Sequence, residues 1–201
     1  MRFRSLVRVT PPSSEPVSLE VAKQHLRVEH DDDDAVVTRC IASAREWCET
    51  YLDATLLYSK WRMTFDYFPV EVQLPKPPMA SHADYDDVVV TYTDDANGVT
   101  TLDASEYRVD RTSLPGTLRP LYSGSWPPHR ADFNACSVTW WAGYGETGDS
   151  LPESIKVAVL MLMTHFYEDR SEVLVGQGVI SKHIEFGVRA LLDSNRWGSY
   201  A

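Results

Sequence analysis

The sequence contains few cysteines, few basic side chains and no long apolar run. Of its 201 residues only 3 are Cys, and 19 Lys and Arg stand against 29 Asp and Glu, which gives a net charge of −10. A negative charge of this size opposes binding to phosphate backbones and to anionic membrane surfaces. The longest apolar run, residues 157–163, is far shorter than the about 18 residues of a membrane helix. We therefore expect neither a conventional nucleic-acid-binding protein nor a membrane protein.

The first residues and the cysteines both indicate a cytoplasmic protein. The basic residues 1–8 lack the apolar core and the small-residue cleavage site of a signal peptide, so we expect the protein in the cytoplasm where it is made. Cys40 and Cys48 would lie about 12 Å apart in a helix, beyond disulfide reach, which predicts free thiols. No Cys-x-x-Cys occurs, and no histidine stands at a helical zinc spacing from another His or Cys. We expect no metal ion and no cofactor.

Two helices are predicted before residue 57. Ser18 is a good N-cap for a short helix from Leu19 to about Val28, in which apolar residues recur every three or four positions. The aspartates at 31–34 are expected to open a longer helix, because carboxylates cap free amides and favour the positive end of the helix dipole. Residues 18–52 therefore predict a helical hairpin. The inner stripe of its second helix is predicted to be Val37, Ile41, Ala44, Cys48 and Leu52.

From Ser59 the apolar period changes from helical to two. Trp61, Met63, Phe65 and Tyr67 alternate with polar residues, which predicts a half-buried strand with these four on one side. Shorter strands are predicted at residues 88–93, 99–102, 107–110, 117–121 and 137–141, which is typical of a small antiparallel sandwich or barrel. We expect an α+β fold in which this β-rich segment, residues 57–148, is inserted into a helical bundle. The bundle comprises residues 1–56 and 149–201.

A long helix is predicted from Pro152 to about residue 170, since proline suits the first helical turn. Its apolar residues run nearly all the way round, so it must be covered on more than one side. The second cover is either the β-rich insert or a neighbouring subunit. A last short helix is predicted at residues 188–192. The candidates for a subunit interface on the long helix are Val157, Leu160, Met161 and Met163.

One motif resembles a dinucleotide-binding loop. Gly143, Gly145 and Gly148 form a Gly-x-Gly-x-x-Gly that follows a predicted strand and precedes a helix. In a dinucleotide-binding unit the helix starts within the motif, whereas here residues 149–152 intervene and no second parallel strand follows. We interpret the motif as an ordinary strand-to-helix turn, and His165 as a core or interface imidazole. The sequence has no serine nucleophile elbow and no Walker motif, so we expect no enzyme.

Acidic residues are concentrated at positions 84–110, where Arg108 is the one basic residue among eight carboxylates. Such a run is either a solvated loop face or a surface that repels a polyanion. A different class also stays open: a carbohydrate-active enzyme or binding module that uses the aromatics and acids of residues 58–145. That alternative requires two facing carboxylates in a pocket.

Several segments, taken in order, carry a family resemblance. Residues 17–28 end in the signature Lys-x-x-Leu-Arg, and the second helix carries Asp32–Asp34, residues 41–46 and Glu49-x-Tyr51. The later segments are residues 74–78, 126–127, 142–145, 151–152, 165–170 and 187–196. Together they resemble the head–tail connector, or adaptor, proteins of tailed bacteriophages and related prophage elements, in their longer branch with a β-rich insert. Where that family often has Gly after the second helix, this chain has Asp53, which tolerates the left-handed conformation.

The resemblance implies a non-enzymatic virion part. It implies a ring of about twelve copies, with the portal protein on one side and a stopper or tail component on the other, through which DNA passes without sequence-specific binding. The protein would assemble in the host cytoplasm and end in the neck of the virion. A stopper or tail-terminator ring is the alternative among structural proteins, although it would lack the helical opening segment.

Two further sets of candidate residues follow from such a ring. Acidic loops of the insert would face the DNA channel or the next ring, where repulsion lowers the affinity for DNA. These candidates are Asp84, Asp86, Asp87, Asp94 and Asp95. A C-terminal arm would become ordered against the portal, unless its aliphatic residues pack back on the bundle. The arm's candidates are Phe186, Leu191, Leu192, Arg196, Trp197 and Tyr200.

Overall fold

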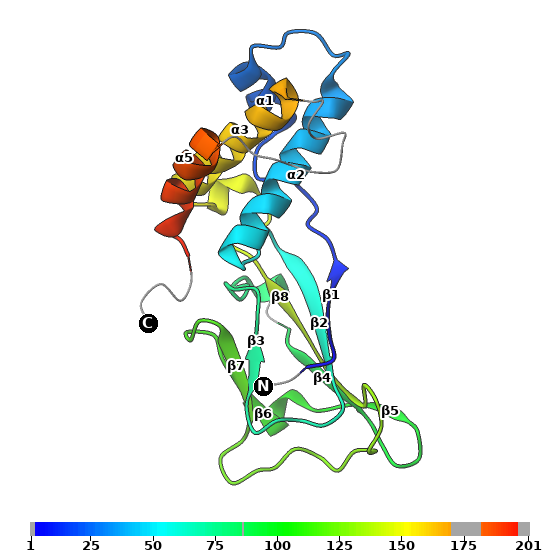
Figure 1. Cartoon of the computed structure of the whole chain (residues 1–201). Coiled ribbons are helices and arrows are strands. Elements are labelled where there is room, and N and C mark those ends of the chain that lie inside the picture. The colour runs from blue at the N-terminus through cyan, green and yellow to red at the C-terminus, as the bar shows by residue number, and fades with distance from the viewer. Residues whose placement is uncertain (1–2, 86, 170–181, 197–201) are drawn as a thin grey trace. The chain divides into compact units, whose positions relative to one another are not determined.

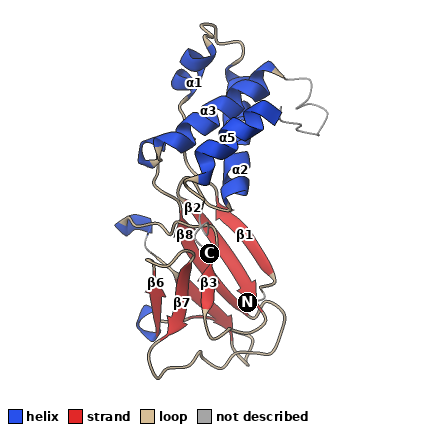
Figure 2. Cartoon of the chain, turned by 60° about the vertical axis from the view of Figure 1, so that its left-hand side comes forward, coloured by secondary structure: helices blue, strands red, loops and turns tan. Residues whose placement is uncertain are grey.

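The structure, a computed structural model, describes residues 3–85, 87–169 and 182–196. The chain divides into two units (Figure 1). The β-rich unit comprises Met1–Pro12 and Tyr58–Tyr144, and the helical unit comprises Ser13–Leu57 and Gly145–Ala201. Strands and α-helices are segregated between them, as the colours of Figure 2 show. The predicted α+β class is confirmed.

The first twelve residues belong to the β-rich unit, whereas the sequence-based division placed them with the helices. Strand β1 (Ser5–Thr10) pairs antiparallel with β2 (Ser59–Phe65), with Ser5 opposite Thr64. About fifty residues separate the two strands, so no local turn signals the pairing. The strand could therefore not be predicted from the basic six-residue segment alone, because its pairing with β2 is a contact between residues distant in the sequence.

Two antiparallel sheets form the β-rich unit. The five-stranded sheet has the order β1-β2-β8-β4-β5, with β8 at Cys136–Ala142, β4 at Val89–Thr93 and β5 at Val99–Thr101. The three-stranded sheet has the order β3-β7-β6, with β3 at Val72–Leu74, β7 at Gly116–Pro120 and β6 at Tyr107–Asp110. Short 3-10 helices lie at Ala83–Tyr85 (η1) and Ala104–Glu106 (η2). All predicted strands are present, while β3, confined between prolines, was missed.

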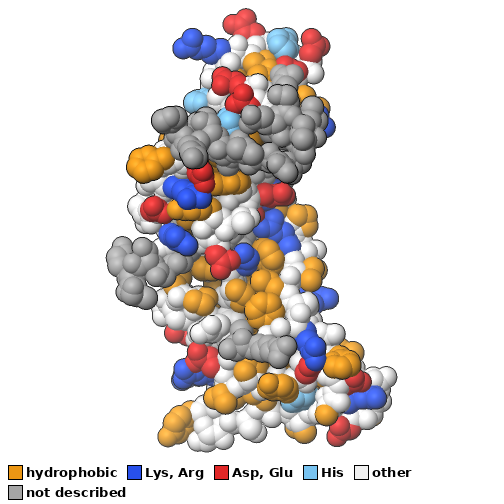
Figure 3. Space-filling view, in the orientation of Figure 1, with side chains coloured by type: hydrophobic (Ala, Val, Ile, Leu, Met, Phe, Trp, Pro, Cys, Tyr) orange, Lys and Arg blue, Asp and Glu red, His pale blue; other side chains and the backbone are white. Residues whose placement is uncertain are grey.

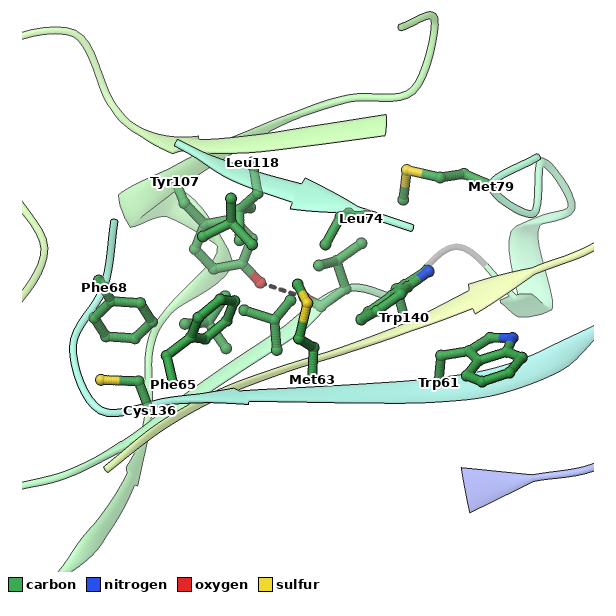
Figure 4. Packing of buried hydrophobic residues seen from close by; sticks show 14 of the residues in the cluster. Trp61, Met63, Phe65, Phe68, Leu74, Met79, Tyr107, Leu118, Cys136 and Trp140 are labelled. Atoms are coloured by element: carbon green, nitrogen blue, oxygen red, sulfur yellow. Dashed lines mark hydrogen bonds between the residues drawn. The ribbon is translucent and has the colours of Figure 1, made fainter. Parts of the chain in front are cut away.

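One apolar core joins the two sheets. Trp61, Met63 and Phe65 point from one face of β2 toward side chains of the three-stranded sheet such as Leu118 (Figure 4). The period of two read from the sequence is therefore the alternation between this core and the surface. Tyr107 is buried in the same cluster and donates its hydroxyl hydrogen to the carbonyl of Val88. The core thus lies between two sheets, which is the sandwich of the two predicted alternatives, sandwich or barrel.

The helical unit contains α1 (Leu19–Leu26), α2 (Asp34–Leu52), α3 (Glu153–Glu168) and α5 (Lys182–Asp193), with a 3-10 helix, η3, at Gly148–Ser150. Ser18 caps α1 as predicted, since its Oγ accepts the amide of Val21 at 3.3 Å. The predicted inner stripe of α2 is buried throughout. Asp53 ends α2 in the left-handed conformation with φ 49, so the turn forms without glycine.

The aspartates before α2 do not cap it in the way the sequence suggested. Asp33 is the N-cap residue, but within the described part of the chain its side chain makes no capping hydrogen bond. It accepts the hydroxyl hydrogen of Tyr167 at 2.5 Å instead. Asp31 and Asp34 bind the Nζ of Lys23 at 2.6 and 2.7 Å. Side chains on α1 and α3 therefore compete successfully with the helix amides for these carboxylates.

Candidate functional site

Helix α3 presents three faces, as the sequence requires of a helix that is apolar nearly all round. One face is buried in the unit and includes Met163, whose side chain is fully enclosed, so it is not a surface residue. A second face meets α5 and the residues that follow it, where Asn195 donates to Ser154 Oγ at 2.8 Å. Met161 lies on that face, and its methyl would be 3.3 Å from a Cβ added at Gly187. The third face carries the remaining two candidates for a subunit interface, Val157 and Leu160.

The third face of α3 lines a surface hollow, which we call the helical groove. Its volume is about 600 Å³. The buried side chains of Val17 and Ile41 contribute to its lining, and Val157 lies in it with 42% of its surface exposed. The groove is therefore an apolar depression open to solvent. Its lining consists of residues 14–19, Val21, Thr38, Ile41, residues 147–149, Glu153, Lys156, Val157 and Leu160.

The rim of the helical groove is polar and mainly acidic. Asp149 is exposed, and the Glu153 side chain is 82% exposed. Lys156 is the basic residue of the lining, and its Nζ lies 2.5 Å from Glu153 Oε1. An apolar depression with a charged rim has the make-up of a protein-binding site, in which apolar contacts lie at the centre and polar ones at the edge.

A buried ion-pair network holds the segment that forms one wall of the groove. Arg45 Nε donates to Glu15 Oε2 at 2.8 Å, and Arg45 Nη1 donates to Glu49 Oε2 at 3.2 Å. Burial lowers the pKa of the Arg45 guanidinium, but its hydrogen bond with Glu15 and the charges of Glu15 and Glu49 raise the pKa by more. Glu49 Oε1 also accepts the amide of Leu56 at 3.0 Å. The network ties the start of the helical unit to α2 and to the chain that follows α2.

The candidates for the C-terminal arm fall into separate environments. Leu192 is fully buried in the helical unit and Leu191 half-buried, so these residues pack back on the bundle. Phe186, in contrast, is 78% exposed. Since residues on a helix are about 100° apart, Phe186 lies about 160° from the buried Val188, on the outer side of α5. Trp197 and Tyr200 lie outside the described residues.

Arg196, the last described candidate of the arm, joins an aromatic cluster. Its guanidinium lies 5.5 Å from the ring centroid of Tyr51, and that of Arg189 lies at the same distance. Tyr51 stacks on Trp47 at 5.4 Å and donates its hydroxyl hydrogen to Asp193 Oδ1 at 2.6 Å. This hydrogen bond raises the pKa of the Tyr51 hydroxyl. Guanidinium groups over aromatic rings are recurrent components of protein interfaces.

The acidic candidates of the β-rich unit do not form one cluster. Asp84 lies in η1 and Asp87 just before β4, where it binds Lys60 Nζ at 3.1 Å. Asp94 and Asp95 follow the other end of β4, about 17 Å away for a strand of five residues. Asp86 lies outside the described residues. Acidic and basic side chains are interspersed over the face drawn in Figure 3, rather than gathered in one patch.

Exposed aromatic side chains lie in the loops of the β-rich unit. Sequence reasoning missed Tyr122 and Phe133, and it wrongly placed Tyr67 on the apolar side of the predicted strand, because β2 ends at Phe65. Tyr67 is 67%, Tyr122 96% and Phe133 73% exposed. Tyr67 and Phe133 share a hollow of about 500 Å³. Phe65, where β2 ends, pairs with Cys136, where β8 begins, so the loops carrying Tyr67 and Phe133 lie at the same end of the sheet. The sequence does contain a hint of these exposed residues, because aromatic residues stand in turn-rich segments that are not expected to contribute to the core.

The residues that suggested other chemistry have structural roles in the part of the chain that is described. A Cβ on Gly148 would lie 1.9 Å from the carbonyl oxygen of Pro16, so this glycine permits a close contact between two segments. His165 is buried, with its Nδ1 2.8 Å from Asp169 Oδ2. All three cysteines are buried, and burial raises the pKa of Cys48 and Cys136 to about 12. The described residues contain no group of His, Cys, Asp and Glu placed to hold a metal ion, and no helix among them has the length and hydropathy to cross a membrane.

Comparison with known proteins identifies the family. The model of the phage gp6-like head–tail connector proteins matches residues 16–121, which is more than half of the chain and includes α1, α2 and most of the β-rich unit. The chain belongs to this family. Its members are structural connectors, so this chain is a connector of a phage or phage-like particle. Among curated proteins, none matches.

Solved structures show that the connector shares its fold with neck components over nearly its whole length. A chain from the neck of an empty gene transfer agent particle, computed with C6 symmetry, aligns with a TM-score of 0.76 and 20% identity, covering 96% of this chain and 95% of the other. A chain from the virion of a native gene transfer agent particle aligns with a TM-score of 0.74 and 20% identity over the same shares. A chain from the neck of a native gene transfer agent particle, computed with C12 symmetry, aligns with a TM-score of 0.70 and 21% identity, covering 96% of this chain and 95% of the other. The similarity thus includes α3 and α5, which the family match does not reach.

Proposed function

We propose that this connector forms a closed ring in the neck of a phage-like particle. In this ring about twelve copies bind the portal protein on one side and a stopper or tail component on the other, and DNA passes through without sequence-specific binding. The connector assembles in the host cytoplasm and catalyses no reaction. The observation that carries the proposal is the shared fold over 96% of the chain with a protein from a neck computed with C12 symmetry.

The surface of the helical unit supports association between copies. The helical groove lies on one face of α3 and α5 covers another, and the centres of the two faces are about 100° apart around the helix. A subunit in a ring contacts each neighbour through a different face, which is the heterologous association that closes when the rotation allows. Val157 and Leu160 are the surface residues of the original interface candidates that remain available for this contact.

The portal contact is assigned to the end of the chain. Arg196, Trp197 and Tyr200 are the proposed contacts, with Arg196 positioned beside the Tyr51 ring, whereas Leu191 and Leu192 pack on the helical unit. Deleting all residues from 186 onward is not a clean test, because Val188 and Leu192 belong to the core. Deleting residues 197–201 is the better variant, and we expect a folded connector that no longer joins portal-bearing heads. Unchanged portal binding by this variant contradicts the assignment.

The acidic residues of the β-rich unit are proposed to face the DNA channel or the next ring. Because they lie at two ends of β4, two charge-reversal variants separate the possibilities: Asp84→Lys with Asp87→Lys, and Asp94→Lys with Asp95→Lys. The pair that faces DNA should increase the retention of DNA by the ring at low salt, since new cations release counterions from DNA. If neither pair changes retention, these residues do not face the channel.

The decisive experiment is a reconstruction of the particle that contains this connector. We expect a ring of this chain between the portal and the tail, with the same fold in every copy. A single copy, an isolated twofold dimer or a position outside the neck would contradict the proposed function.

A further inference from the structure

We propose that in the ring the side chain of Phe186 of each connector enters the helical groove of the next copy. This inference rests on the proposed ring and names the two surfaces that form its subunit contact. Phe186 provides the insertion and the helical groove receives it, so the contact joins two different surfaces of identical chains.

Phe186 has the exposure and the setting of an inserted side chain. It is 78% exposed on the outer side of a helix whose inner side is fully buried at Val188 and Leu192. The helix holds the aromatic ring in place, because Val188 and Leu192 are fully buried and Asn195, just after α5, donates to Ser154 of α3. An aromatic side chain left in water on a well-packed helix gives up the favourable burial of its apolar surface, which contact with a partner surface restores. Large aromatic residues in this position are the common anchors of protein interfaces.

The helical groove has the size and the lining to receive this ring. Its volume of about 600 Å³ exceeds that of one aromatic side chain and leaves room for part of the helix that carries it. Val17, Ile41, Val157 and Leu160 provide an apolar lining. The two surfaces are complementary: one is an exposed apolar depression and the other is an exposed apolar side chain that projects from the helical unit.

The charges around the two surfaces are complementary as well. Arg189 follows Phe186 by one helical turn and has a side chain that is 50% exposed. The groove's rim carries Asp149 and Glu153, with Glu153 82% exposed. Insertion of Phe186 brings Arg189 to this rim. There it can exchange its contacts with Glu185 and the Tyr51 ring for one with the neighbour's carboxylates.

The geometry requires two copies rather than one. Phe186 points away from the core of its own helical unit, about 160° around α5 from Val188. It therefore cannot enter the groove beside α3 of the same chain. Because the inserted residue and the groove are different surfaces, each copy uses one of each, and the association continues from copy to copy until it closes.

Disulfide trapping in assembled particles tests the contact directly. A chain carrying both Val157→Cys and Phe186→Cys is expected to give, under mild oxidation, a ladder of linked species larger than dimers. Each single variant serves as a control and should stay monomeric, since the native cysteines are all buried. Dimers from the Phe186→Cys chain alone indicate a twofold contact and overturn the proposal. A complete ring without any ladder overturns it too, and leaves the proposed function intact.

Competition for incorporation gives an independent measure. When Phe186→Ala and the native chain are expressed together, the variant is expected to enter particles about tenfold less well. Tyr122→Ala, which removes a 96% exposed aromatic from the β-rich unit, is the matched control and should not affect the subunit contact. Arg189→Glu and Glu153→Arg should each reduce incorporation, and the two changes together should restore it. Equal incorporation of Phe186→Ala and the native chain overturns the inference, whereas absence of any ring from native particles overturns the proposed function.

Discussion

The network around Arg45 gives the sharpest prediction of stability. Arg45 and Glu49 are 6% and 5% exposed, and their side chains are joined by a hydrogen bond of 3.2 Å. Replacing Arg45 by Met removes the guanidinium but fills its space with apolar atoms. The carboxylate of Glu49 stays buried and keeps the amide of Leu56, yet it loses the charge that compensates it. Breaking one side of a buried ion pair costs about 3–5 kcal/mol.

Arg45→Met is expected to lower the free energy of unfolding by about 3 kcal/mol, near the lower end of this range. Glu15 has a side chain that is 28% exposed, so it regains water when Arg45 is removed and adds little. Glu49→Gln keeps an acceptor for Leu56 and removes the charge, for a loss of about 1–2 kcal/mol. The double variant leaves no buried charge, so it should lose less than the sum of the two single losses by about 1–2 kcal/mol.

Urea unfolding followed by far-ultraviolet circular dichroism measures these differences, because the helical unit dominates that signal. Each midpoint should shift to lower urea with an unchanged slope. A loss of less than about 1 kcal/mol for Arg45→Met, or strict additivity in the double variant, would refute the reasoning. Either result would mean that the ion pair is not buried as the structure has it.

Three further predictions concern single groups. The thiols of Cys48 and Cys136, whose pKa burial raises to about 12, should not react with a disulfide reagent at pH 8 until urea unfolds the chain; rapid labelling of the folded protein would contradict this. Hydrogen bonds from Thr112 lower the pKa of Asp110, so its contribution to stability is present above the ordinary carboxyl pKa and is lost as the pH falls through the lowered value; an NMR titration midpoint at or above that of an unfolded peptide would disprove it. Gly148→Ala should lower the free energy of unfolding by about 2–3 kcal/mol because of the clash with the Pro16 carbonyl, while Gly98→Ala, whose nearest contact is a side-chain carboxylate at 3.0 Å, should change it little; similar losses for both would refute the clash.

Local patterns in the sequence predicted most elements of the fold. The alternation at Trp61, Met63 and Phe65 is the pleat of β2, and the Ser18 cap begins α1 where expected. What failed depends on contacts between distant residues. Strand β1 needs β2 to become visible, and the carboxylate of Asp33 binds Tyr167 instead of capping its own helix. A sequence window contains no information on such partners.

The candidate site was predictable only in outline. The apolar excess of α3 correctly required more than one cover, but the sequence could not say which of its residues face solvent. Met163 and Val157 are equally apolar in the sequence, and only the position of the neighbouring helices buries one and exposes the other. The helical groove is formed by residues 14–21 and 38–41 together with residues 147–160, more than a hundred positions later in the chain, so no local motif signals it.

The interleaving of the two units determines the order in which the chain can fold during synthesis. Residues 13–57 of the helical unit cannot pack against α3 until the whole β-rich segment and α3 have left the ribosome. Leu57 and Gly145, at the two ends of the insert, then form a β-bridge. In the β-rich unit, β1 likewise cannot pair until β2 has been synthesised. At about 5–20 residues per second, the nascent α1–α2 hairpin spends several seconds without its cover. The apolar stripe of α2 therefore stays exposed until α3 has been synthesised, and transiently exposed apolar surface of this kind is prone to aggregation.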